Sequence, residues 1–224
     1  MGSTYISGRK INKIVRGVPS SDGAGVKMRR LIASPLLDYV DPFLLLDEFR
    51  TDRPGDYIGG FPDHPHRGFE TVTYMLAGRM RHGDNKGNEG LLRPGSVQWM
   101  TAGRGIIHSE MPEQENGLMW GFQLWVNLPA DKKMIAPRYQ DIAPEDIPLI
   151  KRADGIRIKL IAGEVDGIKG AVDGIATNPV FLDITLPRDL SFRHDLPASH
   201  NCFVYPYEGD IAIGSGDRAQ FLPH

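Results

Sequence analysis

The sequence has little cysteine, no long apolar run and no sustained helical periodicity, and each absence excludes a class of protein. Cys202 is the only cysteine in 224 residues, so a disulfide framework is excluded and a reducing compartment fits. We interpret Cys202 as a buried or bystander thiol, because no catalytic cysteine motif surrounds it. No run reaches the length of a membrane span, and the first residues lack the apolar core of a secretion signal. We expect a cytoplasmic protein, or also a nuclear one in a eukaryote.

Neither positive nor negative charge predominates in the sequence. Lys and Arg number 26 against 28 Asp and Glu, which leaves a formal net charge of −2. This composition lacks the basic footprint of a nucleic-acid binder, so we predict neither direct nucleic-acid binding nor membrane binding. A chain of this length can bury a core without disulfides or structural metals, so any bound metal is expected to be functional.

Glycine and proline are abundant, at 26 and 17 residues, and they separate short apolar runs. This pattern is typical of many short strands joined by turns, and it predicts an all-β sandwich or barrel. A short helical turn is predicted at Pro144–Ile147. The apolar runs are Phe43–Leu46, Thr71–Leu76, Gly121–Val126, Ile156–Ile161, Val180–Leu186 and Cys202–Tyr205.

The chain is predicted to divide into two β units. Residues 128–150 carry four prolines among charged residues, which is typical of an extended linker. We therefore predict a metal-binding unit over 1–130, a linker over 131–149 and a second unit over 150–224. The second unit is about half as long as the first. We therefore expect either that it is a partial barrel or that the chain is shortened at its end.

Two pairs of potential metal ligands each have a spacing of two residues. His64 and His66 form the first pair, and His108 and Glu110 form the second, after the glycine-rich Gly103–Gly105. Residues two apart on a strand point to the same face, so each pair can converge on one point. Three imidazoles and one carboxylate suit iron, manganese, nickel, cobalt or copper. On a six-coordinate metal, four such ligands would leave two positions open.

The residues around both pairs resemble the pirin family of the cupin superfamily. The resemblance runs over nearly the whole chain. It implies a bicupin, all-β, with two jelly-roll-like barrels, the metal in the N-terminal one and the second incomplete in this chain. It rests on His64–Tyr74, Gly103–Glu110, Asp41–Asp47 and Gln123–Pro129.

The resemblance also implies the metal ligands, which are His64, His66, His108 and Glu110. General cupins take a glutamate ligand from the first motif, at the place of Glu70, whereas pirins use the glutamate that matches Glu110. Glu70 is therefore expected on a strand face or behind the ligands. Iron is the metal we expect first.

Members of this family are associated with quercetin 2,3-dioxygenase activity. The resemblance therefore implies an enzyme that cleaves flavonols with O2, in which Glu110 is the catalytic group that accepts the proton of the flavonol 3-hydroxyl. Two alternatives stay open. One is a redox-sensitive regulatory protein that acts on a protein partner and uses the metal as a sensor. The other is a sugar- or acid-binding cupin with a structural metal.

Other side chains near the motifs receive weaker predictions. Arg67 either holds a carboxylate behind the ligands or is exposed. His82 is predicted at the surface, at the end of a hairpin. No metal is expected at the histidines of the second unit, which are His194, His200 and His224. Six residues either line a pocket or pack in the core: Phe43, Met75, Trp99, Met100, Phe122 and Trp125.

Overall fold

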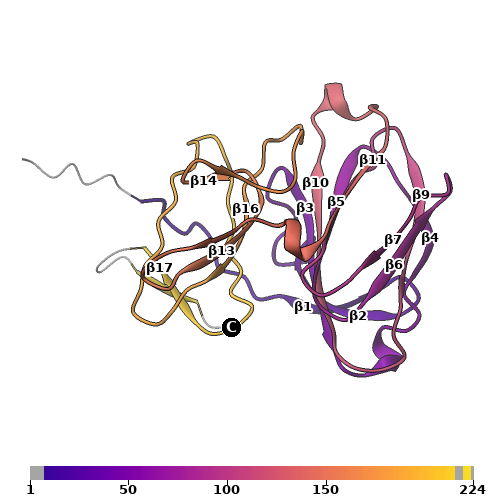
Figure 1. Cartoon of the computed structure of the whole chain (residues 1–224), viewed down its shortest axis with the longest axis horizontal. Coiled ribbons are helices and arrows are strands. Elements are labelled where there is room, and N and C mark those ends of the chain that lie inside the picture. Colours follow the sequence, from indigo (N-terminus) through magenta and orange to yellow (C-terminus); the bar gives the residue numbers. More distant parts are fainter. Residues whose placement is uncertain (1–7, 215–218, 223–224) are drawn as a thin grey trace, which may run out of the picture.

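The computed structural model describes residues 8–214 and 219–222, and these residues form an all-β protein, as predicted. The first unit contains two antiparallel sheets (Figure 1). The larger sheet has seven strands, in the spatial order β1 (Val18–Asp22), β2 (Val26–Ile32), β3 (Phe43–Thr51), β10 (Met119–Asn127), β5 (Phe69–Ala77), β8 (Val97–Thr101) and β11 (Arg138–Ile142). The smaller sheet has four strands, in the order β4 (Phe61–His66), β9 (Ile106–Pro112), β6 (Met80–Asp84) and β7 (Glu89–Leu92).

Strand β10 shows how the sequence divides the two faces of the larger sheet. Phe122 and Leu124 pack in a buried apolar cluster on one face. Gln123 points to the other face, where it contacts the smaller sheet. This alternation has the period of two that a strand requires. Between the sheets, apolar packing is provided by Val26, Met28, Phe49, Tyr57, Met75, Met80, Leu92 and Met119.

The second unit is smaller and its interior is apolar. It consists of a three-stranded sheet and two strand pairs, and Ile156, Ile158, Leu160 and Val165 form its buried core. The division into the predicted ranges 1–130 and 150–224 stays a prediction. The strands are β12 (Leu149–Lys151), β13 (Arg157–Ala162), β14 (Glu164–Val165), β15 (Ile168–Lys169), β16 (Phe181–Thr185), β17 (Ile211–Ile213) and β18 (Gln220–Leu222).

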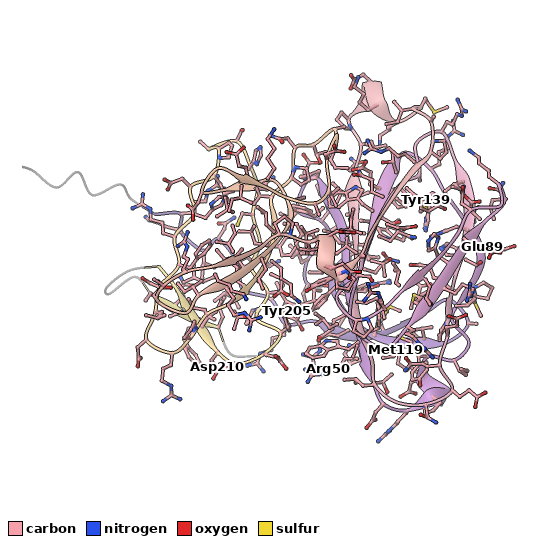
Figure 2. All side chains as sticks on the ribbon, viewed as in Figure 1. Arg50, Glu89, Met119, Tyr139, Tyr205 and Asp210 are labelled. Atoms are coloured by element: carbon pink, nitrogen blue, oxygen red, sulfur yellow. The ribbon has the colours of Figure 1, made fainter. Side chains whose placement is uncertain are left out.

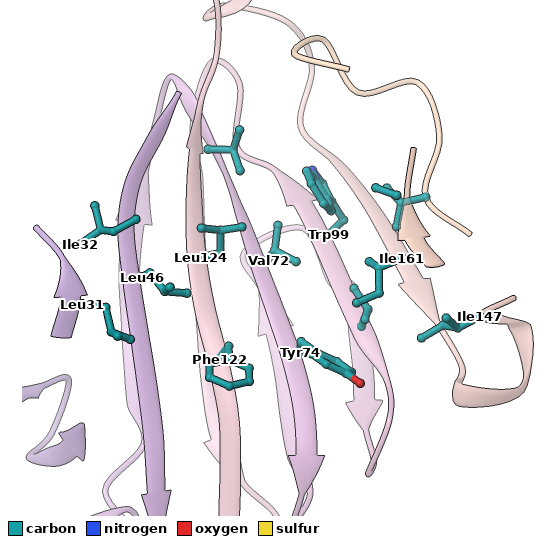
Figure 3. Packing of buried hydrophobic residues seen from close by; sticks show 14 residues of the cluster. Leu31, Ile32, Leu46, Val72, Tyr74, Trp99, Phe122, Leu124, Ile147 and Ile161 are labelled. Carbon is teal, nitrogen blue, oxygen red and sulfur yellow. The ribbon is translucent and has the colours of Figure 1, made fainter. Parts of the chain in front are cut away.

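A shared apolar cluster joins the outer face of the larger sheet to the second unit. Tyr74 and Trp99 of the first unit pack in one cluster with Ile161 of the second (Figure 3). Beside this cluster, Tyr74 Oη donates a hydrogen bond to Asp183 Oδ2 at 2.6 Å. Lys159 Nζ lies 3.5 Å from the same carboxylate oxygen. Apolar packing and a buried polar contact together hold the units against each other.

The segment 131–149, predicted as a linker, contributes a strand to the first unit. Strand β11 lies within it and pairs with β8 over Arg138–Ile142. Its prolines flank the strand rather than interrupt it, so the backbone donors of β11 remain available for pairing. The proline pattern alone did not reveal this strand.

In residues 8–214 and 219–222, helical structure is limited to three 3₁₀ turns of three residues each. These are η1 (Pro54–Asp56), η2 (Ala130–Lys132) and η3 (Pro144–Asp146). The last of them coincides with the predicted helical turn. Within the described ranges, no helix is long and apolar enough to cross a membrane.

Candidate metal centre

Three histidines from two neighbouring strands meet between the sheets of the first unit. His64 and His66 lie on β4, and His108 lies on β9 directly opposite His64. One ligand nitrogen from each lies within 4.8 Å of the others. Their ring centroids are 4.5, 4.7 and 5.0 Å apart. The structure therefore brings together the three imidazoles that the sequence proposed as ligands.

The Nε2 atoms of His64 and His66 lie close enough together to hold one ion. His64 Nδ1 lies 2.8 Å from the carbonyl oxygen of Pro62, which can only accept, so the proton belongs on Nδ1 and Nε2 presents its lone pair. His64 Nε2 lies 3.0 Å from His66 Nε2. Without a metal these two nitrogens share a hydrogen bond, and both would be available to hold one ion.

The burial of His108 is the clearest sign that the site fits a metal. Its side chain is 0% exposed, and neither ring nitrogen has a hydrogen-bond partner among the described residues. Burial, reinforced by His64 and His82, lowers the pKa of His108 to about 3. Burial, reinforced by His108 and His64, lowers the pKa of His66 to about 4. Both rings are therefore neutral near pH 7, which is the form that binds metals.

Two glycines hold the ligand strands in place. Gly103 has a φ of +52°, and a Cβ there would lie 2.2 Å from the carbonyl oxygen of Ile135. Gly68 has a φ of +82°, and its N–H donates to the Gly103 carbonyl at 2.8 Å. Only glycine fits such positions without strain. These contacts fasten the turn after β4 to the loop before β9.

Glu110 lies next to the histidines, and two side chains of the larger sheet hold it there. It is 2% exposed, and it follows His108 by two residues on the inward face of β9. Its Oε1 accepts from Thr73 Oγ1 at 2.8 Å, and its Oε2 accepts from Gln123 Nε2 at 2.9 Å. The group of ligand atoms within 4.8 Å comprises only the histidines. Metal ligation by Glu110 therefore stays a prediction.

A row of six polar side chains crosses the larger sheet and includes both partners of Glu110. Each member lies opposite the next in the strand register: Arg30, Asp47, Gln123, Thr73, Gln98 and Asp141. Sequence reasoning missed this row, because pairing between distant strands is not visible in any one of them. The available signal was a single polar residue inside an apolar strand, as at Gln123 between Phe122 and Leu124.

A cavity of about 170 Å³ opens beside the histidines. His64, His66 and Glu110 line one part of it. The remaining lining residues come from β1 to β4, the loop after β1 and β10: Asp22, Gly23, Met28, Leu45, Asp47, Phe49, Phe61, Pro62, Gln123 and Trp125. The candidate metal site thus lies against a partly aromatic chamber.

Of the six residues predicted to line a pocket or pack in the core, only Trp125 lines this cavity. Two are buried between the sheets, Met75 and Met100. Three belong to the cluster on the outer face of the larger sheet, Phe43, Trp99 and Phe122. Arg67 is exposed, and its Nη2 lies 3.4 Å from Met134 Sδ rather than near a carboxylate.

Glu70 lies three residues before Thr73 on β5, so it points to the opposite face of the larger sheet. Its Oε1 accepts from Thr101 Oγ1 at 2.7 Å. Burial raises the pKa of Glu70, and the Thr101 hydroxyl opposes that rise. Glu70 follows His66 by four residues, but the turn at residues 67–68 places the two on different strands, so they do not share a face.

His82 is buried, and the prediction of a surface position was wrong. It is 1% exposed, and its Nε2 lies 3.2 Å from Asp141 Oδ2. Its ring stacks on Tyr139, labelled in Figure 2, with centroids 5.4 Å apart. His82 lies opposite Glu110 in the register of β6 and β9, so it also faces inward. The hairpin turn comes later, between β6 and β7.

The histidines of the second unit do not converge. His194 and His200 are both half-buried, and His194 stacks on Phe192 with centroids 6.3 Å apart. His224 lies outside the described residues. Over residues 8–214 and 219–222, the cluster of His64, His66 and His108 is the one group of three potential ligands found.

The fold is all-β, and three histidines converge from adjacent strands of its two-sheet unit. These features place the protein among the cupins, with a candidate three-histidine metal site. The Pirin family matches residues 25–126. A protein named "Putative quercetin 2,3-dioxygenase" from Pseudomonas aeruginosa is 52% identical over 214 residues, which are 94% of this chain and 75% of the relative. Pirin of Homo sapiens is 44% identical over 220 residues, 97% of this chain and 73% of that protein. The chain belongs to the pirin family.

Solved structures agree with this assignment. A crystal structure of quercetin 2,3-dioxygenase from Acinetobacter baumannii matches with a TM-score of 0.64 and 38% sequence identity. The match covers 71% of this chain and 58% of that one. The family resemblance inferred from the two histidine motifs is therefore confirmed.

Proposed function

We propose that the protein is a metal-dependent dioxygenase of pirin type, which cleaves flavonols such as quercetin with O2. The proposed ligands are His64, His66, His108 and Glu110. The observation that carries the proposal is His108, whose two ring nitrogens are buried and have no hydrogen-bond partner among the described residues. It lies next to His64 and His66, which line the cavity. Leaving such groups unpaired is costly, and a metal ion would relieve that cost. The names of the Pseudomonas and Acinetobacter relatives support the same chemistry.

Each residue of the site has a role that its surroundings support. The neutral histidines bind the ion, and iron is the ion we propose first, with manganese, nickel, cobalt and copper also fitting the donor set. A bound divalent metal makes a coordinated hydroxyl more acidic. Glu110 accepts the proton of the flavonol 3-hydroxyl. Thr73 and Gln123 orient its carboxylate through the two hydrogen bonds described above.

The cavity supplies a partly dry place for the substrate. Phe49, Phe61 and Trp125 give it aromatic walls beside the candidate ligands. Such walls pack against a flat aromatic ligand and limit the access of water to it. The expected substrate is therefore a planar molecule that carries its reactive hydroxyl at one end.

A single assay tests the proposal. The purified protein is loaded separately with iron, manganese, copper, nickel or cobalt, and the loss of flavonol absorbance is followed under air. We expect loss with at least one metal, and no loss without O2 or with the His108→Ala variant. No loss with any metal would favour the regulatory alternative, in which the metal serves as a sensor for a protein partner.

A further inference from the structure

The cavity has a buried carboxylate on the wall formed by β3. Leu45, Asp47 and Phe49 alternate along this strand, and all three line the cavity. Asp47 is 3% exposed, between two apolar neighbours of the same face. An isolated carboxylate in such a place is costly, so its retention calls for an explanation.

Arg30 compensates the charge of Asp47 from outside the cavity lining. Its Nε lies 2.9 Å from Asp47 Oδ1, and its Nη2 lies 2.7 Å from Oδ2. Nη2 also reaches Asp22 Oδ2 at 3.1 Å. Buried ion pairs add little stability compared with apolar side chains of similar volume. The pair is therefore better explained by what it offers to a ligand than by what it adds to folding.

Asp47 is close to the proposed proton acceptor. It lies opposite Gln123 in the register of β3 and β10, and Gln123 donates to Glu110. The Cβ atoms of such opposite residues are roughly 5 Å apart. Suppose that the reactive oxygen of an aromatic ligand lies beside Glu110 and the histidines. A second substituent on the same ring system would then be able to reach Asp47.

The cavity size limits how much of the ligand is enclosed. Its volume of about 170 Å³ is below the roughly 300–1,000 Å³ of pockets that bury most of a drug-sized ligand. The cavity would therefore enclose only one end of a flavonol-sized molecule. Asp22, another lining residue, has a side chain that is 56% exposed. The enclosed end is the part that Asp47 can recognise.

We infer that Asp47, held by Arg30, accepts a hydrogen bond from a second hydroxyl of the substrate, and that the cavity therefore selects aromatic ligands carrying a phenolic hydroxyl away from the reactive one. A carboxylate only accepts hydrogen bonds, so an ether or an unsubstituted ring at that place would leave without a donor the lone pairs of Asp47 that Arg30 does not use. This inference rests on the proposed function and refines its substrate class. It makes Asp47 a residue that determines specificity, in addition to the residues that hold the metal.

Anaerobic binding tests this inference without turnover. Iron(II)-loaded protein is titrated with quercetin and with 3-hydroxyflavone, which keeps the reactive hydroxyl and ketone but lacks the ring hydroxyls. We expect wild-type protein to bind quercetin at least tenfold more tightly, since a hydrogen bond to a charged group contributes about a factor of ten or more. In Asp47→Asn the ratio of the two affinities should fall to within about threefold.

A matched control separates recognition from damage to the fold. Asp183→Asn changes another buried carboxylate that is paired with a cation. Because Asp183 lies at the contact between the units, the ratio of the quercetin and 3-hydroxyflavone affinities should stay as in wild type. Should Asp47→Asn fail to fold, flavonols that each lack one ring hydroxyl decide the question with wild-type protein. One of these hydroxyls must then account for the tenfold difference.

The outcomes distinguish the two claims. Equal affinities for quercetin and 3-hydroxyflavone in wild type, or an unchanged ratio in Asp47→Asn, overturn the role of Asp47 and leave the proposed function standing. Failure of both flavonols to bind the metal-loaded wild-type protein overturns the proposed function, and this inference with it.

Discussion

The two units of this protein use strands in the same way but fill their interiors differently. Between the sheets of the first unit lie converging histidines, Glu110 and the two central members of the polar row, Gln123 and Thr73. The interior of the second unit consists of apolar residues such as Ile156, Ile158 and Leu160. Strand alternation places side chains inward in both units. The difference shows that the chemistry depends on which residues occupy inward positions, and not on the β architecture itself.

The largest expected effect is the loss of the metal from the first unit. His108→Ala removes a completely buried imidazole from the cluster, so the metal content should fall to below about a tenth of that of wild type. His194→Ala changes a histidine of the second unit and should leave the metal content unchanged. Elemental analysis of both proteins makes the comparison. Metal retained in His108→Ala, or lost in His194→Ala, would break the contrast between the units.

Glu110→Gln should have the next largest effect. The amide keeps the size of the side chain but cannot accept a proton as a base, so turnover of a flavonol should fall by roughly a hundredfold or more, while much of the metal remains. Steady-state kinetics on protein of known metal content measure this. Activity equal to that of wild type would exclude Glu110 as the proton acceptor.

Removing a partner of Glu110 should have a smaller effect. Gln123→Leu deletes the donor to Oε2 and leaves the Thr73 hydroxyl on Oε1, so turnover should fall by roughly tenfold with little change in metal content. Gln140→Leu on β11, outside the polar row, is the matched control and should behave like wild type. If both variants retain full turnover, the orienting role of the row is wrong.

Acid should destabilise the metal-free protein through the first unit. Burial lowers the pKa values of His66 and His108 to about 4 and about 3, whereas an unfolded histidine titrates near roughly 6.5. Between these values the unfolded state binds more protons, so stability falls as the pH drops from about 6.5 toward about 4. The loss should be on the order of several kcal/mol, at about 1.4 kcal/mol per pKa unit.

Denaturant unfolding of the metal-free protein at pH 7.5 and pH 5 measures this loss. A double variant with His66→Gln and His108→Gln should lose most of the pH dependence, since the two groups that resist protonation are gone. If the unfolding free energy depends on pH equally in wild type and in the double variant, titratable groups other than His66 and His108 cause the loss of stability.

The smallest expected effect concerns the contact between the units. Tyr74→Phe removes the hydrogen bond that Tyr74 donates to Asp183 and the one that it accepts from Lys159. Asp183 keeps its hydrogen bond from Tyr207 and its ion pair with Lys159. The free energy of unfolding should fall by about 1 kcal/mol. Metal content should not change, because Tyr74 faces away from the site. Loss of metal in this variant would show that the two units depend on each other more closely than the structure indicates.

The sequence predicted the three histidines because their evidence is local. His64 and His66 share a strand face through a spacing of two, and the turn with Gly103 precedes His108. The all-β fold was predictable for the same reason, since short apolar runs and turn residues can be recognised without knowledge of their partners. The family resemblance then related the two histidine motifs to each other.

The parts that sequence reasoning missed depend on pairing between distant strands. Asp47, Gln123 and Thr73 are far apart in the chain and become neighbours only through the register of β3, β10 and β5. His82 appeared to end a hairpin, but the pairing of β6 with β9 buries it. Burial and register are tertiary properties, so composition and spacing could not assign these residues.

The central claim is that one metal ion lies among the histidines of the first unit. Anomalous diffraction from crystals of the metal-loaded protein, recorded at the absorption edge of the metal, tests this most directly. We predict a single strong peak within bonding distance of His64, His66 and His108, with a Glu110 oxygen also coordinated. A peak in the second unit, or none among these three histidines, would contradict the account.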